Sequence, residues 1–329
     1  ARGTRVSGQT VLNVVRKFKS EQIEVKEKPT VKKKCRILYI EADEDHVAHQ
    51  AKGTRAFEQR LVYVHEGRRC VSKERYELIG KKYFTFEPGT KTEYIWNTVW
   101  HYLDDTYDLD QTHHIFIIGD GASWIKAGGE YIPKSIYVLD GFHLRMAILR
   151  ASGDNDDNRQ ALSQAVWTGK RAEMNRLLEA LHAEAEEESR KEIIQRTYRY
   201  LNNHWRAIQA GRQYRHLLVG CSAEGHVSHI LSARLSSRPM AWSYLGANQM
   251  AHLRVHRANN IDLHKIHIEH SNKRKKLAVN GFLSKASQSS LAKAAGESYE
   301  TFGNIPSLHR SSGSLRPFLR QISNSAFDF

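Results

Sequence analysis

The chain has 329 residues, of which 40% are hydrophobic and 26% are charged, enough for one large or two ordinary domains. No apolar run approaches the roughly 18 residues that span a bilayer, and no secretory signal opens the chain. These features exclude a membrane protein and lead us to expect a cytoplasmic location. The formal net charge of +14 favours a polyanionic partner such as nucleic acid.

The three cysteines, Cys35, Cys70 and Cys221, are scattered along the chain without a paired motif. This spacing argues against a disulfide framework and against a cysteine zinc site.

Residues 1–34 form a basic lead-in, and the helical spacing of Val11, Val14, Val15 and Phe18 suggests the end of a missing N-terminal region. A strand is expected at Cys35–Ala42, directly before Asp43-Glu44-Asp45. Two further strands and an amphipathic helix are then expected at Arg60–His65, Lys82–Glu87 and Glu93–Tyr107.

The apolar run His114–Ile118 predicts a buried strand that ends at Asp120. A strand at Ser135–Leu139 ends at Asp140, and a helix starts near Phe142. Strands that are followed by alternating strands and helices predict a mixed α/β sheet covered on both faces. Residues 35–151 would be the first part of this core.

Residues 152–213 change in character and predict an all-helical insertion with two long helical patterns. The core resumes over residues 214–255, with a helix expected at about Ala223–Leu235. Residues 256–329 read as a basic, partly disordered tail.

Three acidic residues occupy positions suited to chemistry. Asp43 and Asp120 follow strands and Glu224 begins a helix, and strand ends are where such sheets place their sites. Strand alternation puts Asp45 on the same face as Asp43, which makes Asp45 a rival ligand. Convergent carboxylates suit two Mg²⁺ or Mn²⁺ ions, which together promote phosphodiester chemistry.

Four strings resemble a known bacterial group. They are Ile40-Glu41-Ala42-Asp43-Glu44-Asp45-His46-Val47, Gly119-Asp120-Gly121-Ala122-Ser123-Trp124-Ile125-Lys126, Leu139-Asp140-Gly141-Phe142-His143-Leu144, and Cys221-Ser222-Ala223-Glu224-Gly225-His226-Val227-Ser228-His229 with the following Arg234–Ser243. Over about residues 35–255 the chain resembles the Lre-type insertion-sequence transposases, a group similar to the Mutator-like Asp-Asp-Glu transposases.

The resemblance implies a ribonuclease-H-like mixed sheet with an all-helical insertion before the last catalytic helix. It implies Asp43, Asp120 and Glu224 as metal ligands, and Asp140 with His143 as an Asp-x-x-His signature. Related families often have Cys-x-x-His there, so any role that rests on a thiol is lost.

Structural roles compete with these assignments. Asp120 and Asp140 could each cap the helix that follows, and Glu224 could be an exposed first-turn glutamate. His226 and His229 lack a third zinc ligand at a suitable spacing.

DNA contacts are expected from basic and aromatic side chains. Trp205 is either a core residue or a base-stacking residue. The candidates for backbone contacts are Arg234, Arg238, Lys273, Arg274, Lys275 and Lys276.

The expected function is that of a DNA transposase which hydrolyses the phosphodiester at its element's ends and joins them to target DNA. Its partner would be double-stranded DNA, to which it would bind as a homo-oligomer associated with the nucleoid. The alternatives are an inactive DNA-binding relic, a nuclease without strand transfer and, more remotely, a carboxylate-pair glycosidase.

Overall fold

The computed structural model comprises two compact units, residues 1–264 and 265–329. The residues that the structure describes are 6–17, 31–51, 53, 55–73, 75–265 and 268. In these ranges no helix has the length and apolar character needed to cross a membrane.

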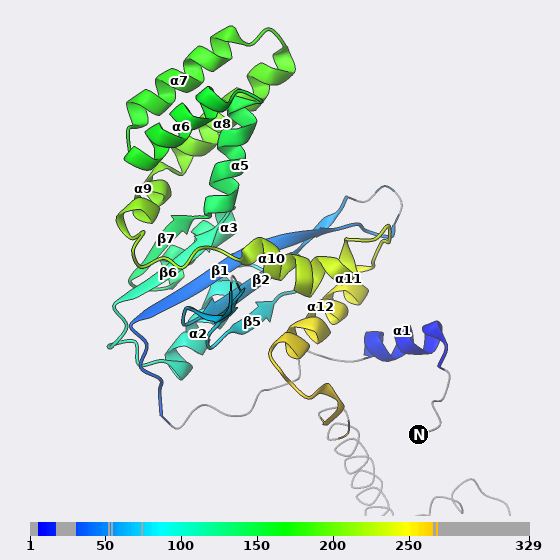
Figure 1. Ribbon diagram of the computed structural model, residues 1–329. Coiled ribbons are helices and arrows are strands. Elements are labelled where there is room, and N and C mark those ends of the chain that lie inside the picture. Colours follow the sequence, from blue (N-terminus) through cyan, green and yellow to red (C-terminus); the bar gives the residue numbers. More distant parts are fainter. Residues whose placement is uncertain are drawn as a thin grey trace, which may run out of the picture. The chain divides into compact units, whose positions relative to one another are not determined.

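A five-stranded mixed sheet forms the centre of the first unit, in the order β5-β2-β1-β6-β7 (Figure 1). Strand β1 pairs antiparallel with β2 and parallel with β6; β2 pairs antiparallel with β5, and β6 pairs parallel with β7. The bounds of the strands are β1 Ile37–Val47, β2 Phe57–His65, β5 Lys82–Thr85, β6 His114–Gly119 and β7 Ser135–Leu139. The mixed α/β prediction is confirmed.

Strand β1 is longer than the sequence predicts. It does not end at Ala42 but continues through the acidic cluster to Val47. The extension occurs because Asp43 and the residues after it pair with β2, with Asp43 opposite Leu61. The parallel pairing with β6 stops earlier, at Glu41 opposite Ile118. Asp43 therefore lies inside β1 but just beyond the end of its neighbour β6.

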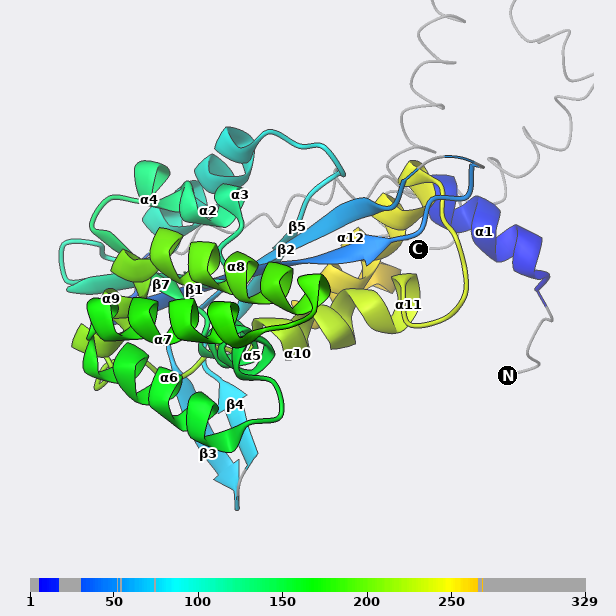
Figure 2. The ribbon, with the colours of Figure 1, turned by 90° about the horizontal axis from the view of Figure 1, so that it is seen from above.

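Helices α2 (Thr92–Thr106), α3 (Ser123–Lys126) and α4 (Gly128–Tyr131) cover one face of the sheet (Figure 2). Alternate residues of the strands point into this layer because side chains alternate between the two faces. The main contributions to this core from β1, α2 and α3 are Leu38, Ile40, Ala42, Ile95, Trp96, Val99, Trp124 and Ile125.

A helical segment that contains three short elements lies on the opposite face. Helix α10 (Ala223–Val227) leads into a π-helical turn, η2 (Ser228–Ser232), and then into α11 (Ala233–Leu235), so the predicted helix over 223–235 has a π-helical middle. Helix α12 (Tyr244–Ala258) packs beside them, although the sequence analysis did not predict it.

Only helices lie between β7 and α10 (Figure 1). Two long helical patterns were expected for residues 152–213. This number is wrong, because four helices occur there. Gly169 breaks the first pattern with a left-handed φ of 79°, and His204 separates the last two helices. With α5 (Gly141–Ser152), the helices are α6 Asp156–Thr168, α7 Arg171–Glu184, α8 Glu188–Asn203 and α9 Trp205–Gln213.

Two elements lie outside the sheet and its layers. One is the N-terminal helix α1 (Gly8–Lys17). The other is a hairpin of β3 (Arg68–Ser72) and β4 (Arg75–Leu78), a separate two-stranded sheet that extends away from the core (Figure 2). The hairpin was not predicted from the sequence because its side chains are almost all exposed and its strands carry no apolar alternation.

Candidate active site

The carboxyl ends of three parallel strands bring predicted site residues together. Asp120 directly follows β6 and Asp140 directly follows β7, while Asp43 lies in β1 where β6 stops. The N–H of Asp140 donates to the carbonyl oxygen of Gly119 at 2.8 Å, which fixes the two strand ends side by side. Parallel strands thus place three acidic residues from distant parts of the chain at one edge of the sheet.

Asp43 is an acid in an environment that disfavours its charged form. Its side chain is only 8% exposed, and one backbone N–H, that of Glu44, donates to its Oδ1 at 2.9 Å. Burial raises the pKa of Asp43 to about 7; the Glu44 N–H opposes this, and the negative charges of Asp120 and Glu224 add to it. A buried carboxylate with acidic neighbours is a position that a cation would stabilise.

Asp120 and Glu224 approach Asp43 from different elements. The half-buried Asp120 accepts a hydrogen bond from the N–H of Ala122 at 2.9 Å, which holds the turn after β6. Glu224 is exposed in the first turn of α10. As they stand, no three His, Cys, Asp or Glu side chains of the described ranges converge closely enough to hold a metal ion.

His143 and Asp140 form an ion pair beside the acids. Nδ1 of His143 lies 2.8 Å from Oδ2 of Asp140. The hydrogen bond to Asp140 raises the pKa of His143, and the charges of Asp140, Asp43 and Asp120 act in the same direction. Although burial opposes it, the bonds from His143 and from the Phe142 N–H lower the pKa of Asp140. Asp140 therefore both caps α5 and holds the imidazole of His143, whose pKa it raises.

The helical insertion is tied directly to the turn that carries Asp120. The hydroxyl of Tyr200 in α8 donates to the carbonyl oxygen of Asp120 at 2.6 Å. Gly121 has a φ of +111°, and a Cβ there would lie 2.7 Å from Nε2 of His204. A side chain at Gly121 would thus push His204 away. A cavity of about 460 Å³ opens at this junction, with Asp120, His143, Arg150 and Tyr200 in its wall.

A buried polar network under the site involves Glu41, which the sequence analysis did not select. Glu41 is 1% exposed; Oε1 lies 2.9 Å from Nε2 of His65, and Oε2 accepts from the N–H of Ser222 at 2.7 Å and from the Tyr63 hydroxyl. Because Ser222 immediately precedes α10, Glu41 fastens the start of the helix that carries Glu224 to β1. A glutamate inside an otherwise apolar strand was the available sequence signal.

Asp45 lies on the same face of β1 as Asp43 but has different partners. Its Oδ1 accepts hydrogen bonds from the hydroxyls of Ser232 at 2.9 Å and Ser236 at 2.6 Å. Ser232 is the last residue of η2, and Ser236 directly follows α11. Asp45 thus anchors the end of that helical segment, while Asp43 lies near its beginning.

The other predicted contacts are dispersed. Arg234 and Arg238 are exposed, and the Arg234 guanidinium lies 5.6 Å from the centre of the Trp242 ring. Trp205 is half-buried and packs against the core of the insertion, as the structural alternative expects. His226 forms a 2.9 Å hydrogen bond with the Tyr83 hydroxyl. The basic run from Lys273 to Lys276 lies outside the described residues.

Several proteins of the bacterium Caldanaerobacter subterraneus subsp. tengcongensis are similar to the chain. Three of these UPF0236 proteins are 39–40% identical over 261 or 262 residues, which covers 79–80% of this chain and 52–55% of each relative. The chain thus spans about half the length of the curated relatives it matches.

A solved structure, the Drosophila P element transposase strand transfer complex, matches 69% of this chain and 65% of that chain. The identity is 9% and the TM-score is 0.22, which is too low to establish a shared fold. The profile of one family, described as an uncharacterised protein family, matches residues 3–272. The chain belongs to this family, UPF0236.

Proposed function

We propose that the protein is a metal-dependent DNA transposase. The observation that carries the proposal is Asp43, a buried carboxylate whose pKa is raised to about 7 and whose neighbours include Asp120 and Glu224. Strongly perturbed carboxylates occur preferentially at functional sites, where a ligand provides the missing stabilisation. The same three residues are the acids that the resemblance to insertion-sequence transposases selects.

The sheet supports a ribonuclease-H-like core. Strands β1, β2 and β5, the first three of this sheet in sequence, pair antiparallel in that order. Strands β6 and β7 follow on the other side of β1 and run parallel to it. The proposed acids come from β1, from the end of β6 and from α10, which follows the helical insertion. This arrangement would let one metal site receive ligands from three distant chain segments.

The donor set fits Mg²⁺ or Mn²⁺, because three carboxylates provide hard oxygen ligands. Divalent cations between these carboxylates would offset their mutual repulsion. Asp43, Asp120 and Glu224 would hold two ions, which when bound would activate an attacking oxygen and stabilise the leaving oxygen. Glu224 is exposed, so its side chain can change rotamer on a short timescale.

His143 would bind the substrate phosphate. Its imidazole is held by Asp140, and its raised pKa favours the protonated form, which would offer a positive N–H donor next to the acids. A charge-assisted hydrogen bond to a non-bridging phosphate oxygen would position the phosphorus. Asp140 acts through His143 and is a positioning residue.

The chemistry consists of two displacements at phosphorus. In the first, water forms a bond to phosphorus at the element's end, the bond to the 3′ oxygen breaks, and that oxygen leaves as a 3′-hydroxyl. In the second, this hydroxyl attacks a target phosphodiester and loses its proton, while a target 3′ oxygen leaves. Joining two element ends to one target site would require at least two copies of the chain on DNA.

The names of the relatives also favour a mobile element. One relative's name joins eleven locus designations from a single genome, and another joins four. A protein encoded at many positions of one genome is the pattern that an element leaves when it copies itself.

The test is cleavage of a labelled duplex that carries the sequences flanking the gene, with Mg²⁺ or Mn²⁺. We expect metal-dependent nicking by the wild type. Asp120→Asn should abolish it because the carboxylate charge is lost, while the Asn side chain can still accept the hydrogen bond from the Ala122 N–H and keep the turn in place. Asp110→Asn, at an exposed turn residue, is the matched control and should cleave normally. Equal nicking by the wild type and Asp120→Asn would overturn the site.

The products separate the competing functions. Joined products that depend on the flanking sequences indicate a transposase, whereas nicking without joining indicates a nuclease. Binding of the duplex without nicking by the wild type would indicate an inactive relic.

A further inference from the structure

The β3–β4 hairpin and the surface facing it enclose a hollow of about 800 Å³. One wall comes from the hairpin, and the other comes from residues 219–222 and from α10. The Arg68 guanidinium lies 3.9 Å from the position that a Cβ at Gly220 would occupy, so the two walls approach closely at that point. This surface, the hairpin hollow, is distinct from the cavity beside Asp120 and His143.

Positive charge dominates the hairpin hollow. Arg68, Arg75 and Lys81 line it, and none of them pairs with a carboxylate in the part of the chain that the structure describes. The described lining contains one carboxylate, Glu77, whose charge is offset by Arg69 at 3.0 Å. Unpaired cations around a hollow form a site for an anion.

An aromatic ring lies among these cations. Tyr76 is 55% exposed, and the Arg68 guanidinium is 4.5 Å from the centre of its ring. Nucleic-acid surfaces combine basic side chains, which contact phosphates, with aromatic rings, on which bases stack. An exposed β-ribbon is also an element that enters a DNA groove.

The hairpin hollow adjoins the proposed site. Ser222 lines it, and Glu224, which does not itself line the hollow, follows two residues later in α10. A long polyanion bound in the hollow would therefore continue toward the acids, which a small anion would not do.

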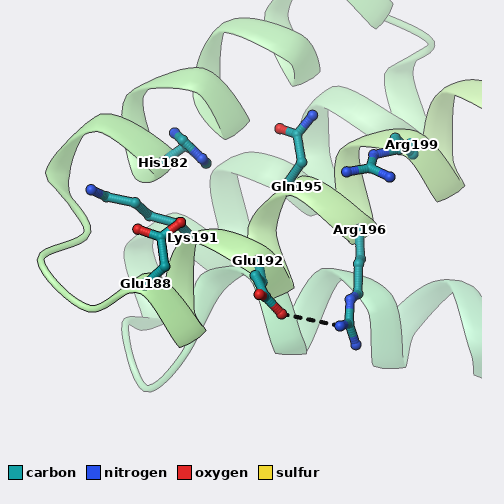
Figure 3. A pocket seen from close by; sticks show the side chains of 7 residues that line it. All are labelled: His182, Glu188, Lys191, Glu192, Gln195, Arg196 and Arg199. Carbon is teal, nitrogen blue, oxygen red and sulfur yellow. Dashed lines mark hydrogen bonds and ion pairs between the residues drawn. The ribbon is translucent and has the colours of Figure 1, made fainter.

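The hollow between α7 and α8 is a useful contrast (Figure 3). It has a volume of about 410 Å³, and the lining cations Lys191, Arg196 and Arg199 are accompanied by Glu188 and Glu192. Arg196 is paired with Glu192 at 3.1 Å. Its charges largely offset one another, so it attracts a polyanion less than the hairpin hollow does.

We infer that the hairpin hollow binds the phosphate backbone of the DNA that flanks the reacting phosphodiester, with Arg75 and Lys81 contacting phosphates and Tyr76 stacking on or packing against the nucleotides. This assignment rests on the proposed function for the identity of the polyanion. It adds a binding surface whose lining includes neither Arg234 nor Arg238.

The test measures binding without chemistry. Every protein carries Asp120→Asn, the buffer contains EDTA, and the probe is a fluorescein-labelled duplex of about 30 base pairs titrated at several salt concentrations. We expect Arg75→Gln with Lys81→Gln to weaken binding about tenfold to fiftyfold near 0.1 M salt. The slope of log K against log salt should fall by about 2, since each phosphate contact contributes roughly 0.9.

The matched control is Lys191→Gln with Arg199→Gln, which removes one lysine and one arginine from the hollow between α7 and α8. We expect this control to change the slope by less than about 0.5. Equal loss in the two double variants would overturn the inference, because net charge alone would then explain the binding. An unchanged slope in Arg75→Gln with Lys81→Gln would also overturn it.

Two further arms complete the test. Tyr76→Ala should weaken binding about threefold to thirtyfold with little change in the salt slope, because stacking is not ionic. An RNA duplex of the same sequence that binds more tightly than DNA would contradict the assignment to DNA. Because no arm requires cleavage, the binding results can be interpreted even if the proposed catalysis is wrong.

Discussion

Glu41 and Asp43 stand two residues apart on one face of β1, and their carboxylates have opposite surroundings. Glu41 is surrounded by donors: burial alone would raise its pKa, but the bonds from His65, Tyr63 and Ser222 lower it below the ordinary value. Asp43 has a single backbone donor and acidic neighbours, and burial raises its pKa to about 7. The hydrogen-bonding partners of a buried carboxylate therefore decide whether the protein itself stabilises its charged form.

Asp45 extends the comparison along the same strand. Two serine hydroxyls satisfy its Oδ1 while its Oδ2 has no partner among the described atoms. It resembles Glu41 in joining β1 to the helical segment that carries Glu224. Of the three, Asp43 is the one whose pKa is raised to about 7, chiefly by burial and further by the charges of Asp120 and Glu224, and the proposed chemistry therefore centres on it.

The largest expected effect is on catalysis. Asp43→Asn should reduce metal-dependent nicking at least about a thousandfold, roughly 4 kcal/mol of transition-state stabilisation, because a proposed metal ligand loses its charge. Single-turnover nicking measures this. Nicking by Asp43→Asn within about tenfold of the wild type would mean that Asp43 is not a ligand.

Removing the network under the site should cost stability. Glu41→Ala removes the acceptor of the Ser222 N–H and the partner of the buried His65 Nε2, so we expect a loss of about 3–5 kcal/mol in the free energy of unfolding. Glu41→Gln keeps an acceptor and should lose about 1–3 kcal/mol. Denaturant titration measures both, with Glu184→Gln at an exposed position as the control.

The pH dependence of the Glu41 effect follows from its lowered pKa. A glutamate with a lower pKa in the folded state stabilises the fold above its unfolded pKa, and this stabilisation is lost as pH falls through the folded value. The difference between wild type and Glu41→Gln should therefore shrink in acid. A difference that grows in acid would contradict a charged Glu41.

Asp43 should show the opposite sign. Because its folded pKa is about 7, the folded state binds a proton more tightly than the unfolded state, and stability is lost as pH rises from about 4 to 7. Without metal, Asp43→Asn should raise the free energy of unfolding by about 1–3 kcal/mol at pH 8 and leave it unchanged at pH 3. Thermal and denaturant melts in EDTA test this.

Mg²⁺ should reverse the order of stability of the wild type and Asp43→Asn that is expected in EDTA. We expect Mg²⁺ to raise the melting temperature of the wild type and to have little effect on Asp43→Asn, since binding to the folded state alone stabilises it. A destabilised Asp43→Asn at pH 8 in EDTA would show that the native carboxylate is already satisfied.

The smallest effect is expected at Asp45. Asp45→Asn retains an oxygen that can accept from Ser232 and Ser236, so stability should change by less than about 1 kcal/mol. Nicking should remain within about threefold of the wild type. A loss as severe as that of Asp43→Asn would make Asp45 the ligand and would reverse the distinction between the two residues.

The positions of Asp120, Asp140 and Glu224 could be predicted because they depend on local patterns. The apolar run before Asp120 and the strand before Asp140 end where the structure ends β6 and β7. A helix start at Glu224 likewise follows from its local sequence. The ligand assignment itself stays a prediction.

Other parts of the site could not be predicted because they depend on distant partners. Glu41 contacts Ser222, which lies 181 residues away, and Asp45 contacts residues 187 and 191 positions along the chain. No spacing rule reveals such pairs. The hairpin escaped detection for a different reason, since its exposed strands lack the alternation that marks a half-buried sheet.

The sequence by itself determined the mixed α/β character, the main strands and the helical region before α10, since runs of apolar residues and their period specify local structure. Only the tertiary structure decided how far β1 extends, because Asp43 to Val47 become a strand through pairing with β2. It also decided the different surroundings of Glu41, Asp43 and Asp45. Alternation gives these three carboxylates one face, but the surroundings of each depend on the side chains that packing brings to it.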